Sequence, residues 1–460
     1  MTGIRHVAVI DIGKTNAKVA LVDLDNVSEI AVCRTANTTL RDSIYPHYDV
    51  ERLWDFILGS LATLNLGQPI DAISVTTHGA TAALLRADGE LALPVLDYEH
   101  DGPEHLAVEY DALRPGFSES GTPRLPLGLN LGAQIHWQSQ AFPLQFADVR
   151  WIVTYPQYWA CRLSGVPANE VTSLGCHTDL WNLSAADFSS LVDKLGWRAL
   201  MAPIRKAHDR LGSVLPLVAQ RTGIAANTPV FCGIHDSNAS LLPHLLSRSR
   251  PFAVVSTGTW VVAMAVGGKH MELDPGRDTL INVNAFGEAV PSARFMGGRD
   301  YAILTSDLPG DSTDDDVAAV LEKGIRLLPS VTTGSGPFPR KQAKWISPDG
   351  STPGQRRVAT SFYLAMMTSY CLGLVGASGD TVVEGPFARN ELYVRMLAAA
   401  TRRPVIAFTH GATGTSTGAA LLAATLGLSL PQHGDIVGSP GAVWEKYGKE
   451  WEDLQRGSGD

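Results

Sequence analysis

The strongest constraint on the fold of this chain is one pattern that occurs twice, about half a chain length apart. Residues 7–23 alternate apolar and other side chains on both sides of a polar turn that contains Gly13. Residues 252–266 repeat the same order around Gly258. Alternation on both sides of a glycine turn predicts a β-hairpin. Two hairpins at this separation predict an internal duplication with two related domains.

The remaining segments alternate between helix and strand patterns. Helices are predicted over 50–64, 241–250, 357–376 and 391–401, and strands over 72–76, 151–153 and 404–408. Helices that cover sheets in this way indicate an α/β fold. The chain has 460 residues, which is long enough for two domains with separate cores. We predict a first domain over residues 1–240 and a second over 241–460.

Composition excludes several classes of function. The formal net charge is −9 without a basic cluster, so neither nucleic acid nor an anionic membrane is an expected partner. The sequence shows no signal peptide and no apolar run of transmembrane length, which predicts a cytoplasmic protein. The five cysteines are scattered without a C-x-x-C pair, which favours reduced thiols over a zinc site or a disulfide framework.

The first turn also fits a loosened phosphate-loop pattern, which leaves a P-loop nucleoside triphosphatase as an alternative. That mechanism requires a glycine-rich loop whose amides wrap the phosphates, followed at once by a helix. Residues 9–12 contain no glycine, and their β-branched side chains suit a strand. The alternation after Thr15 also favours a strand. A helix directly after Thr15 would instead favour the P-loop.

As the turn of a hairpin, the same residues suit phosphate binding in another way. Donors for phosphate oxygens are expected from Gly13, Thr15 and Asn16. Asp11, at the end of the first strand, is placed to hold a hydrated Mg²⁺, which prefers carboxylate oxygens and retains several waters. Lys14 or Lys18 can offset the charge of a transferring phosphoryl group.

Five motifs, taken in order along the chain, carry a resemblance to a known family. They are DIGKTNAK (11–18), GIHDSNAS (233–240), STGTW (256–260), VVEGPFARN (382–390) and GTSTGAALLA (414–423). Together they resemble the FGGY family of carbohydrate kinases, in the actin/hexokinase-like superfamily. The order of the motifs makes the match specific, whereas any single motif would be weak. The STGTW form and the His-Asp pair at 235–236 are most similar to the rhamnulokinase and fuculokinase branch.

The resemblance implies two duplicated actin/hexokinase-like (ribonuclease H-like) domains with a cleft between them, and an enzyme that uses ATP and Mg²⁺ to phosphorylate a sugar. It implies phosphate contacts from Gly13, Lys14, Thr15, Asn16, Lys18, Ser256, Thr257, Gly258 and Thr259. It implies adenosine contacts from Gly385, Arg389 and Asn390. Two positions depart from the family pattern, since Lys14 stands where Thr or Ser is more frequent and Pro386 where a second glycine is usual.

Asp236 is the predicted catalytic base for the hydroxyl proton of the acceptor. It follows the apolar run 229–234 and should lie at the end of a strand, where Gly233 leaves room for a substrate. Desolvation in a closed site would strengthen this carboxylate as a proton acceptor. The structural alternative for Asp236 is a helix N-cap before Ser237.

Sugar recognition requires several hydrogen-bonding groups and often an aromatic wall. The candidates by position are His78, Gly79, Glu99, His100, Asp101, Tyr155, Gln157, His177, His235 and Asp236. Isolated histidines are more often structural than ligand-binding, so each histidine also has a packing alternative.

The branch resemblance implies a 6-deoxyketohexulose acceptor such as L-rhamnulose or L-fuculose. A pentulose (xylulose or ribulose) or a polyol is the alternative acceptor. A non-catalytic sugar sensor with a kinase fold is the alternative of another class, although a sensor has no need for both Asp11 and Asp236. The expected partners are the sugar and ATP, and a homodimer is left open.

Overall fold

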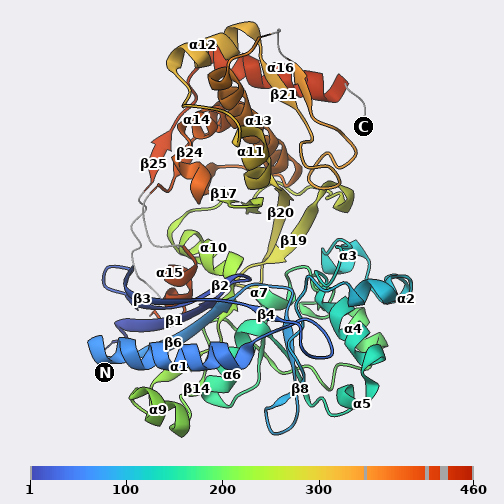
Figure 1. Cartoon of the computed structure of the whole chain (residues 1–460), viewed down its shortest axis with the longest axis vertical. Coiled ribbons are helices and arrows are strands. Elements are labelled where there is room, and N and C mark those ends of the chain that lie inside the picture. Colours follow the sequence, from blue (N-terminus) through green and yellow to red (C-terminus); the bar gives the residue numbers. More distant parts are fainter. Residues whose placement is uncertain (1–2, 347–349, 410–413, 425–433, 458–460) are drawn as a thin grey trace. The chain divides into compact units, whose positions relative to one another are not determined.

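The computed structural model describes residues 3–346, 350–409, 414–424 and 434–457 (Figure 1). The chain forms two compact units, and neither is a single stretch of sequence. The first unit consists of residues 1–247, 281–289 and 411–431. The second unit consists of residues 248–280, 290–410 and 432–460. The chain thus leaves the first unit after Ser247, and two later segments return to it.

The first unit is built on a mixed sheet in the order β14-β15-β6-β1-β2-β3, and β16 also pairs with β6. Its strands are β1 (His6–Ile12), β2 (Asn16–Asp23), β3 (Ser28–Ala36), β6 (Ala72–Thr77), β14 (Arg210–Ser213), β15 (Pro229–Phe231) and β16 (Ile234–His235). β1 runs antiparallel to β2 and parallel to β6. β15 and β16 also run parallel to β6. The carboxyl ends of β1, β6 and β16 therefore meet at one edge of the sheet.

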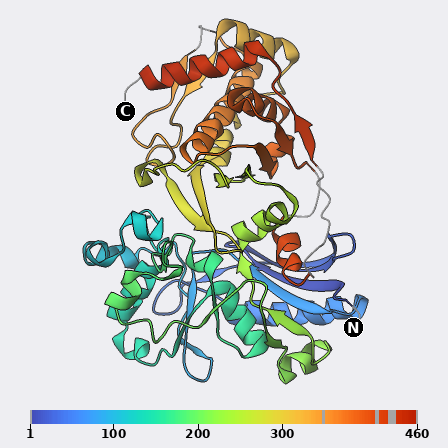
Figure 2. The same ribbon diagram turned by 180° about the vertical axis from the view of Figure 1, so that it is seen from behind.

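The side chains of β1 enter two different cores because successive residues of a strand point to opposite faces. Ala8, Ile10 and Ile12 belong to a core with α1 (Val50–Gly67), α6 (Tyr155–Ser164) and α9 (Pro216–Thr222). Val7 and Val9 belong to a core with α10 (Asp236–Ser247) and α15 (Gly414–Leu421). Viewed from either side, the red α15 lies beside the green α10 over the blue strands (Figure 1 and Figure 2). Burial on both faces explains the near-continuous apolar sequence of β1.

Smaller elements complete the first unit. The strands are β4 (Thr39–Leu40), β5 (His47–Tyr48), β7 (Ala82–Leu85), β8 (Leu91–Leu93), β9 (Trp151–Thr154), β10 (Asn169–Glu170), β11 (Trp181–Asn182), β12 (Asp187–Phe188) and β13 (Ile204–Arg205). The helices are η1 (Gly102–Leu106), α2 (Ala107–Leu113), α3 (Phe117–Ser120), α4 (Leu131–Ala141), α5 (Pro143–Phe146), α7 (Val171–Leu174) and α8 (Ser190–Lys194). β7 pairs with β8 and β9 in a three-stranded sheet.

The second unit repeats the design around its own hairpin. Its main strands are β17 (Phe252–Thr257), β18 (Val261–Val266), β20 (Ala289–Phe295), β23 (Asp380–Glu384), β24 (Val405–Ala407) and β25 (Asp435–Val437), in the sheet order β20-β18-β17-β23-β24-β25. β17 runs antiparallel to β18 and parallel to β23, as β1 runs to β2 and β6. β19 (Thr279–Val283) begins in this unit and continues into the first unit from Ile281, and β21 (Arg326–Leu328) pairs with β22 (Lys344–Ile346). The helices are η2 (Pro275–Arg277), α11 (Gly297–Thr305), α12 (Asp314–Lys323), α13 (Pro353–Leu374), η3 (Pro386–Arg389), α14 (Glu391–Thr401) and α16 (Ala442–Gly457).

These strands and helices confirm both predicted hairpins and the α/β fold. The P-loop alternative is wrong, because β2 begins at Asn16 and a strand therefore follows Thr15. The helix predicted over 241–250 begins earlier, at Asp236, and ends at Ser247. Within the described part of the chain, no helix is both long enough and apolar enough to cross a bilayer.

Candidate active site

Asp11 and Asp236 lie at the carboxyl ends of strands that flank β6. In the sheet register Thr76 of β6 pairs with Asp11 on one side and with Ile234 on the other. Asp236 follows two residues after Ile234, as the first residue of α10. The negative charge of Asp236 is one of the factors that raise the pKa of Asp11. The charge of the predicted base thus acts on the predicted metal ligand within the first unit.

Burial of Asp11 raises the pKa of its carboxyl to about 6, and the ammonium of Lys18 opposes this rise. Lys18 Nζ lies 3.5 Å from Asp11 Oδ2 and 3.0 Å from Glu29 Oε1. Lys18 is the partner of Asp11 in the β1–β2 register, and Glu29 belongs to the next strand, β3. The charge of Asp11 at neutral pH is therefore sensitive to any further cation.

The turn between β1 and β2 is fixed by its own backbone and by Asn37. Gly13 N donates to the carbonyl oxygen of Asn16 at 2.9 Å. Asn37 Nδ2 donates to the Gly13 carbonyl oxygen at 2.8 Å, and Asn37 N donates to that of Thr15 at 2.9 Å. Thr15 and Asn16 themselves are exposed. Contacts of this turn with phosphate remain a prediction.

His235 is buried directly beside Asp236. Its Nε2 lies 3.3 Å from Asp236 Oδ1, and its backbone N donates to Thr172 Oγ1 at 3.0 Å. Burial alone would lower the pKa of this imidazole, but the facing Cys176 and Asp236 raise it to about 9. A Cβ atom on Gly79 would lie 2.7 Å from His235 Nε2. Gly79 therefore gives His235 the space it occupies, whatever its relation to a sugar.

Glu170 is a buried carboxylate that the sequence analysis did not single out. Its Oε2 accepts hydrogen bonds from Thr172 N at 3.0 Å and from Thr172 Oγ1, the atom that also bonds His235. Burial raises the pKa of Glu170 to about 7. Glu170 and Thr172 thus hold the backbone of His235, whose ring lies beside the predicted base.

His78 is packed among tyrosine rings at the end of β6. Its ring centroid lies 5.2 Å from Tyr48, 5.5 Å from Tyr98 and 5.1 Å from Tyr155. Its Nδ1 lies 2.9 Å from the Gly79 carbonyl oxygen, and burial lowers the pKa of the imidazole to about 4. His78 is therefore neutral at physiological pH.

Gln157 and Tyr155 of α6 are fully buried behind these residues. Gln157 Nε2 donates to the carbonyl oxygens of Cys232 and Gly233, at 3.0 and 3.2 Å. Gln157 therefore fixes the segment that leads into β16 and Asp236. Sugar contacts of these two side chains remain predictions.

The predicted sugar contacts at 99–101 lie in the segment that follows Asp97. Glu99 is exposed, and its carboxylate lies 3.4 Å from Lys14 Nζ. His100 stacks edge-on against Trp137, with ring centroids 5.1 Å apart. His100 Nδ1 also lies 3.4 Å from Asp101 Oδ1. Lys14 thus connects the first turn with this segment.

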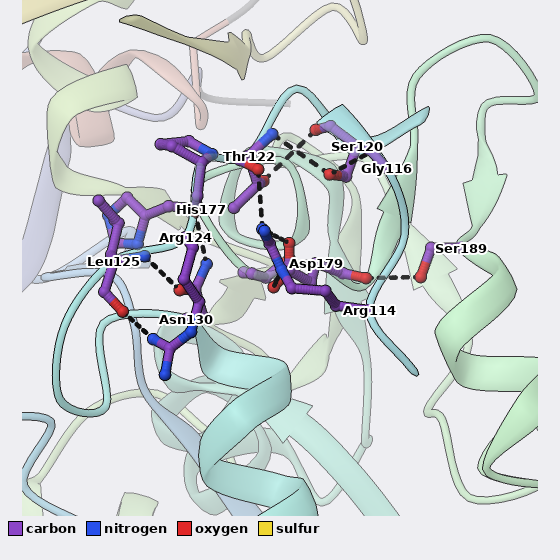
Figure 3. A network of polar contacts seen from close by, with 12 residues as sticks. Arg114, Gly116, Ser120, Thr122, Arg124, Leu125, Asn130, His177, Asp179 and Ser189 are labelled. Carbon is purple, nitrogen blue, oxygen red and sulfur yellow. Dashed lines mark hydrogen bonds and ion pairs between the residues drawn. The ribbon is translucent and has the colours of Figure 1, made fainter. Parts of the chain in front are cut away.

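A buried polar network fixes the segment that carries His177 (Figure 3). Arg114 donates to the Asp179 carboxylate through Nε at 3.1 Å and Nη2 at 2.8 Å. Tyr110 Oη donates to the same carboxylate at 2.7 Å. His177 Nδ1 lies 2.8 Å from the carbonyl oxygen of Leu129. One ring nitrogen of His177 is thus engaged with the backbone, and its predicted sugar contact remains a prediction.

In the second unit, the predicted phosphate residues lie at the end of β17 and in the turn after it. Ser256 and Thr257 end the strand, and Gly258 N donates to the carbonyl oxygen of Trp260 at 2.9 Å. Gly258 and Thr259 are exposed. Thr257 Oγ1 instead donates to the Glu384 carbonyl oxygen and accepts from Phe387 N at 3.1 Å. Thr257 therefore ties β17 to the segment after β23.

The predicted adenosine residues lie between β23 and α14. Gly385 has a φ of +83°, and a Cβ atom there would lie 2.1 Å from the Thr257 carbonyl oxygen. Asn390 caps α14 by accepting from Tyr393 N at 3.1 Å, and its Nδ2 donates to Ser361 Oγ at 3.0 Å. Arg389 Nε donates to the backbone of residue 409 at 3.2 Å. The Asn390 side chain thus serves the fold, and adenosine binding by this segment remains a prediction.

Comparison with known proteins decides the family. The N-terminal domain of the FGGY family of carbohydrate kinases matches residues 6–243, and the FGGY C-terminal domain matches residues 249–431. The chain belongs to the FGGY family of carbohydrate kinases. The resemblance carried by the five motifs is thereby confirmed.

Solved structures of carbohydrate and glycerol kinases share the whole fold. A carbohydrate kinase from Novosphingobium aromaticivorans is 34% identical, with a TM-score of 0.89 and 99% of each chain covered. Ligand-bound xylulose kinase from Lactobacillus acidophilus is 16% identical, with a TM-score of 0.80 and coverage of 98% of this chain and 97% of that one. Plasmodium falciparum glycerol kinase with ADP is 13% identical, with a TM-score of 0.82 and coverage of 99% and 98%. These kinases differ in the acceptor for which they are named.

Curated FGGY relatives match over a shorter region. An L-fuculokinase from Salmonella typhi is 22% identical over 273 residues, which is 57% of each chain. An autoinducer-2 kinase from Klebsiella pneumoniae is 24% identical over 222 residues, which is 46% of this chain and 41% of the relative. The matches span about half of the length of these relatives.

Proposed function

We propose that the chain is an ATP-dependent sugar kinase in which Asp236 is the catalytic base and Asp11 the metal-binding carboxylate. One observation carries the proposal. The two carboxylates lie at the carboxyl ends of the two strands that flank β6, and the charge of Asp236 adds to the rise that burial causes in the pKa of Asp11. Phosphoryl transfer requires a base for the acceptor proton and compensation of phosphate charge, and a sugar-binding module without turnover requires neither.

In the proposed reaction the acceptor hydroxyl oxygen forms a bond to the γ-phosphorus of ATP as the bond to the bridging oxygen of ADP breaks. Asp236 accepts the hydroxyl proton. His235, whose Nε2 lies 3.3 Å from Asp236 Oδ1, orients the carboxylate. A general base contributes about 10²–10⁴-fold to the rate, and this contribution depends on correct placement of the oxygen that receives the proton.

Mg²⁺ fits Asp11 in the mode that this ion uses in phosphoryl-transfer sites. Mg²⁺ commonly binds one or two carboxylates together with substrate phosphates and retained waters. Within the described residues there is no cluster of three or more His, Cys, Asp or Glu side chains that could hold a metal by itself. Asp11 is nearly buried and carries a raised pKa, so a second cation beside it would favour its charged form. Bound there, Mg²⁺ would neutralise charge on the phosphates.

We further propose a neutral ketose as the acceptor, with a 6-deoxyketohexulose such as L-fuculose or L-rhamnulose first in the order of testing. The fuculokinase relative and the His235–Asp236 pair support this order. The likeness in fold to xylulose and glycerol kinases keeps pentuloses and polyols in the panel.

Release of ADP from ATP and Mg²⁺ across a panel of ketoses, aldoses and polyols tests the proposal. We expect turnover with one or a few ketoses, and a loss of about 10²–10⁴-fold in kcat for Asp236→Asn. Asp307→Asn, which changes an exposed carboxylate of the second unit, is the matched control and should behave like wild type. Sugar binding in a thermal-shift assay without any ADP release would favour the sensor alternative and sink the kinase proposal.

A further inference from the structure

The side chain of Lys14 extends from the first turn toward Asp97. The turn on either side of it is bonded to Asn37, through the carbonyl oxygens of Gly13 and Thr15. The ammonium of Lys14 pairs with the carboxylate of Asp97. The side chain of Lys14 is only 19% exposed, and that of Asp97 only 4%. The positive charge of Lys14 is therefore largely neutralised by the buried carboxylate of Asp97.

Two tyrosine rings and a second carboxylate complete the surroundings of this ammonium. Lys14 Nζ lies 5.1 Å from the ring centroid of Tyr48 and 4.8 Å from that of Tyr98. It also lies 3.4 Å from Glu99 Oε2. An ammonium over aromatic faces is held more firmly as it loses water. Movement of Lys14 toward another anion would leave the Asp97 carboxylate buried without its cation, which is strongly unfavourable.

The groups that hold Lys14 belong to the segment predicted to bind the sugar. Asp97 also accepts from Thr39 Oγ1 at 2.9 Å and from the backbone N of Glu99 at 3.1 Å. The ring of Tyr98 packs edge-on against the ring of His78, with centroids 5.5 Å apart. His78 is followed by Gly79, which lies against His235 beside the proposed base. Lys14 is thus linked by direct contacts to the acceptor side of the site.

We propose that Lys14 is a positioning residue of the acceptor-sugar site, which holds residues 97–99 in place, and that it is not a ligand of the ATP phosphates. This inference rests on the proposed function for its assignment of acceptor and donor. It also explains the departure from the family pattern, since a Thr or Ser at residue 14 could not reach Asp97. The sequence had placed Lys14 among the phosphate contacts.

The charges around Lys14 also indicate which acceptors fit. One ammonium faces the carboxylates of Asp97 and Glu99, so the group carries a net negative charge. A carboxylated or phosphorylated sugar would be repelled there, and such repulsion is an effective source of specificity. The local charge at residues 97–99 thus favours a neutral acceptor over an anionic one.

Nucleotide affinity and acceptor KM, measured for Lys14→Met, distinguish a role in positioning the acceptor site from a role as a phosphate ligand. We expect the Kd for AMP-PNP with Mg²⁺ to stay within about twofold of wild type, and the KM for the acceptor found in the panel to rise about tenfold or more. Lys14→Arg should restore part of the acceptor KM. Lys446→Met, which removes an exposed lysine of α16, is the control. A tenfold rise in the Kd for AMP-PNP, or in the KM for ATP alone, would overturn the inference.

Two further measurements keep the inference testable if the proposed function fails. If wild type turns over no acceptor, the kinase proposal fails, and the part of the inference that Lys14 holds residues 97–99 is then decided by thermal unfolding of Lys14→Met, Asp97→Asn and the double variant. We expect the double variant to lose less in Tm than the sum of the single losses, because either single change disrupts the pair. Simple additivity would overturn the inference. Turnover of D-gluconate as efficient as that of a neutral ketose would overturn the charge argument.

Discussion

A Cβ atom on Gly79 would lie 2.7 Å from Nε2 of His235, the same nitrogen that faces Asp236 Oδ1 at 3.3 Å. No side chain at residue 79 can therefore coexist with the imidazole in its present place. The orientation of Asp236 therefore depends on the ring of His235. The position of that ring depends on Gly79, which follows β6. The proposed catalytic geometry thus depends on the absence of a side chain at residue 79.

Gly79→Ala should lower kcat by about ten- to hundredfold, because a displaced His235 no longer orients Asp236 and small misplacements cost activity of this order. The free energy of unfolding should fall by only about 1–3 kcal/mol, as for an overpacked site. ADP release and urea unfolding measure the two effects. Gly59→Ala in α1, where a Cβ meets nothing within 4 Å, is the control and should leave kcat unchanged. A normal kcat in Gly79→Ala would show that His235 does not orient the base.

Protons should compete with Mg²⁺ for Asp11. Since the pKa of this carboxyl is raised to about 6, the apparent Mg²⁺ affinity should fall about tenfold for each pH unit below 6 and level off above it. A Mg²⁺ titration of ADP release at several pH values between 5 and 8 measures this. Asp11→Asn should lose most of its activity, and its residual activity should lack the dependence. A Mg²⁺ requirement that is the same at pH 5 and pH 8 would contradict the assignment.

Glu170→Gln should change how stability depends on pH. The pKa of Glu170 is raised from 4.5 to about 7 by burial, so the folded state binds this proton more tightly than the unfolded state does. The resulting stability is fully present below the unfolded pKa and is lost as the pH rises through 7. Glutamine keeps an acceptor for Thr172 but cannot ionise. Relative to wild type, the variant should therefore gain about 2–3 kcal/mol in free energy of unfolding between pH 5 and pH 8. Parallel stability curves from urea unfolding would show that Glu170 does not titrate in this range.

Gly418→Ala should destabilise the first unit, because a Cβ atom there would lie 1.7 Å from the carbonyl oxygen of Ala239 in α10. The two helices would have to separate, at a cost of about 1–3 kcal/mol or more. Because α10 begins at Asp236, kcat should fall as well. Gly373→Ala in α13, where a Cβ meets nothing within 4 Å, is the control. Equal unfolding midpoints for the two variants would refute this packing argument.

Local sequence patterns predicted the elements of this fold well where the pattern and the turn agreed. The two hairpins each have apolar, β-branched segments on both sides of a turn that contains a glycine, and both are present. The helix predicted over 391–401 coincides with α14, since its periodic apolar face follows a capping Asn390. Asp236 stands at the end of β16 as expected, because an apolar run that ends in glycine and a polar pair is typical of a buried strand.

The environment of the site was harder to predict, because its contacts join residues far apart in sequence. Thr172, which bonds Glu170, contacts His235 over a separation of 63 residues, and Lys14 contacts Asp97 over 83 residues. Neither pairing leaves a local signal beyond a carboxylate followed by Thr and Ser at 170–173. The turns that carry the predicted phosphate contacts, by contrast, could be located from sequence, and their contacts with ATP remain predictions. The sequence did not predict which of these side chains bond to the protein's own backbone, as Thr257 does to Glu384 and Phe387.

The place of α15 has a consequence for how the chain is made. This helix covers the face of the sheet that carries Val7 and Val9, and it packs on α10, yet it lies close to the end of the sequence. A ribosome that has released the first 247 residues has not yet supplied it. Until Gly414–Leu421 emerge, α10 alone packs on that face and part of its apolar surface stays exposed, as in the nascent intermediates on which chaperones act. An early stop just before Gly414 would therefore damage the first unit as well as the second.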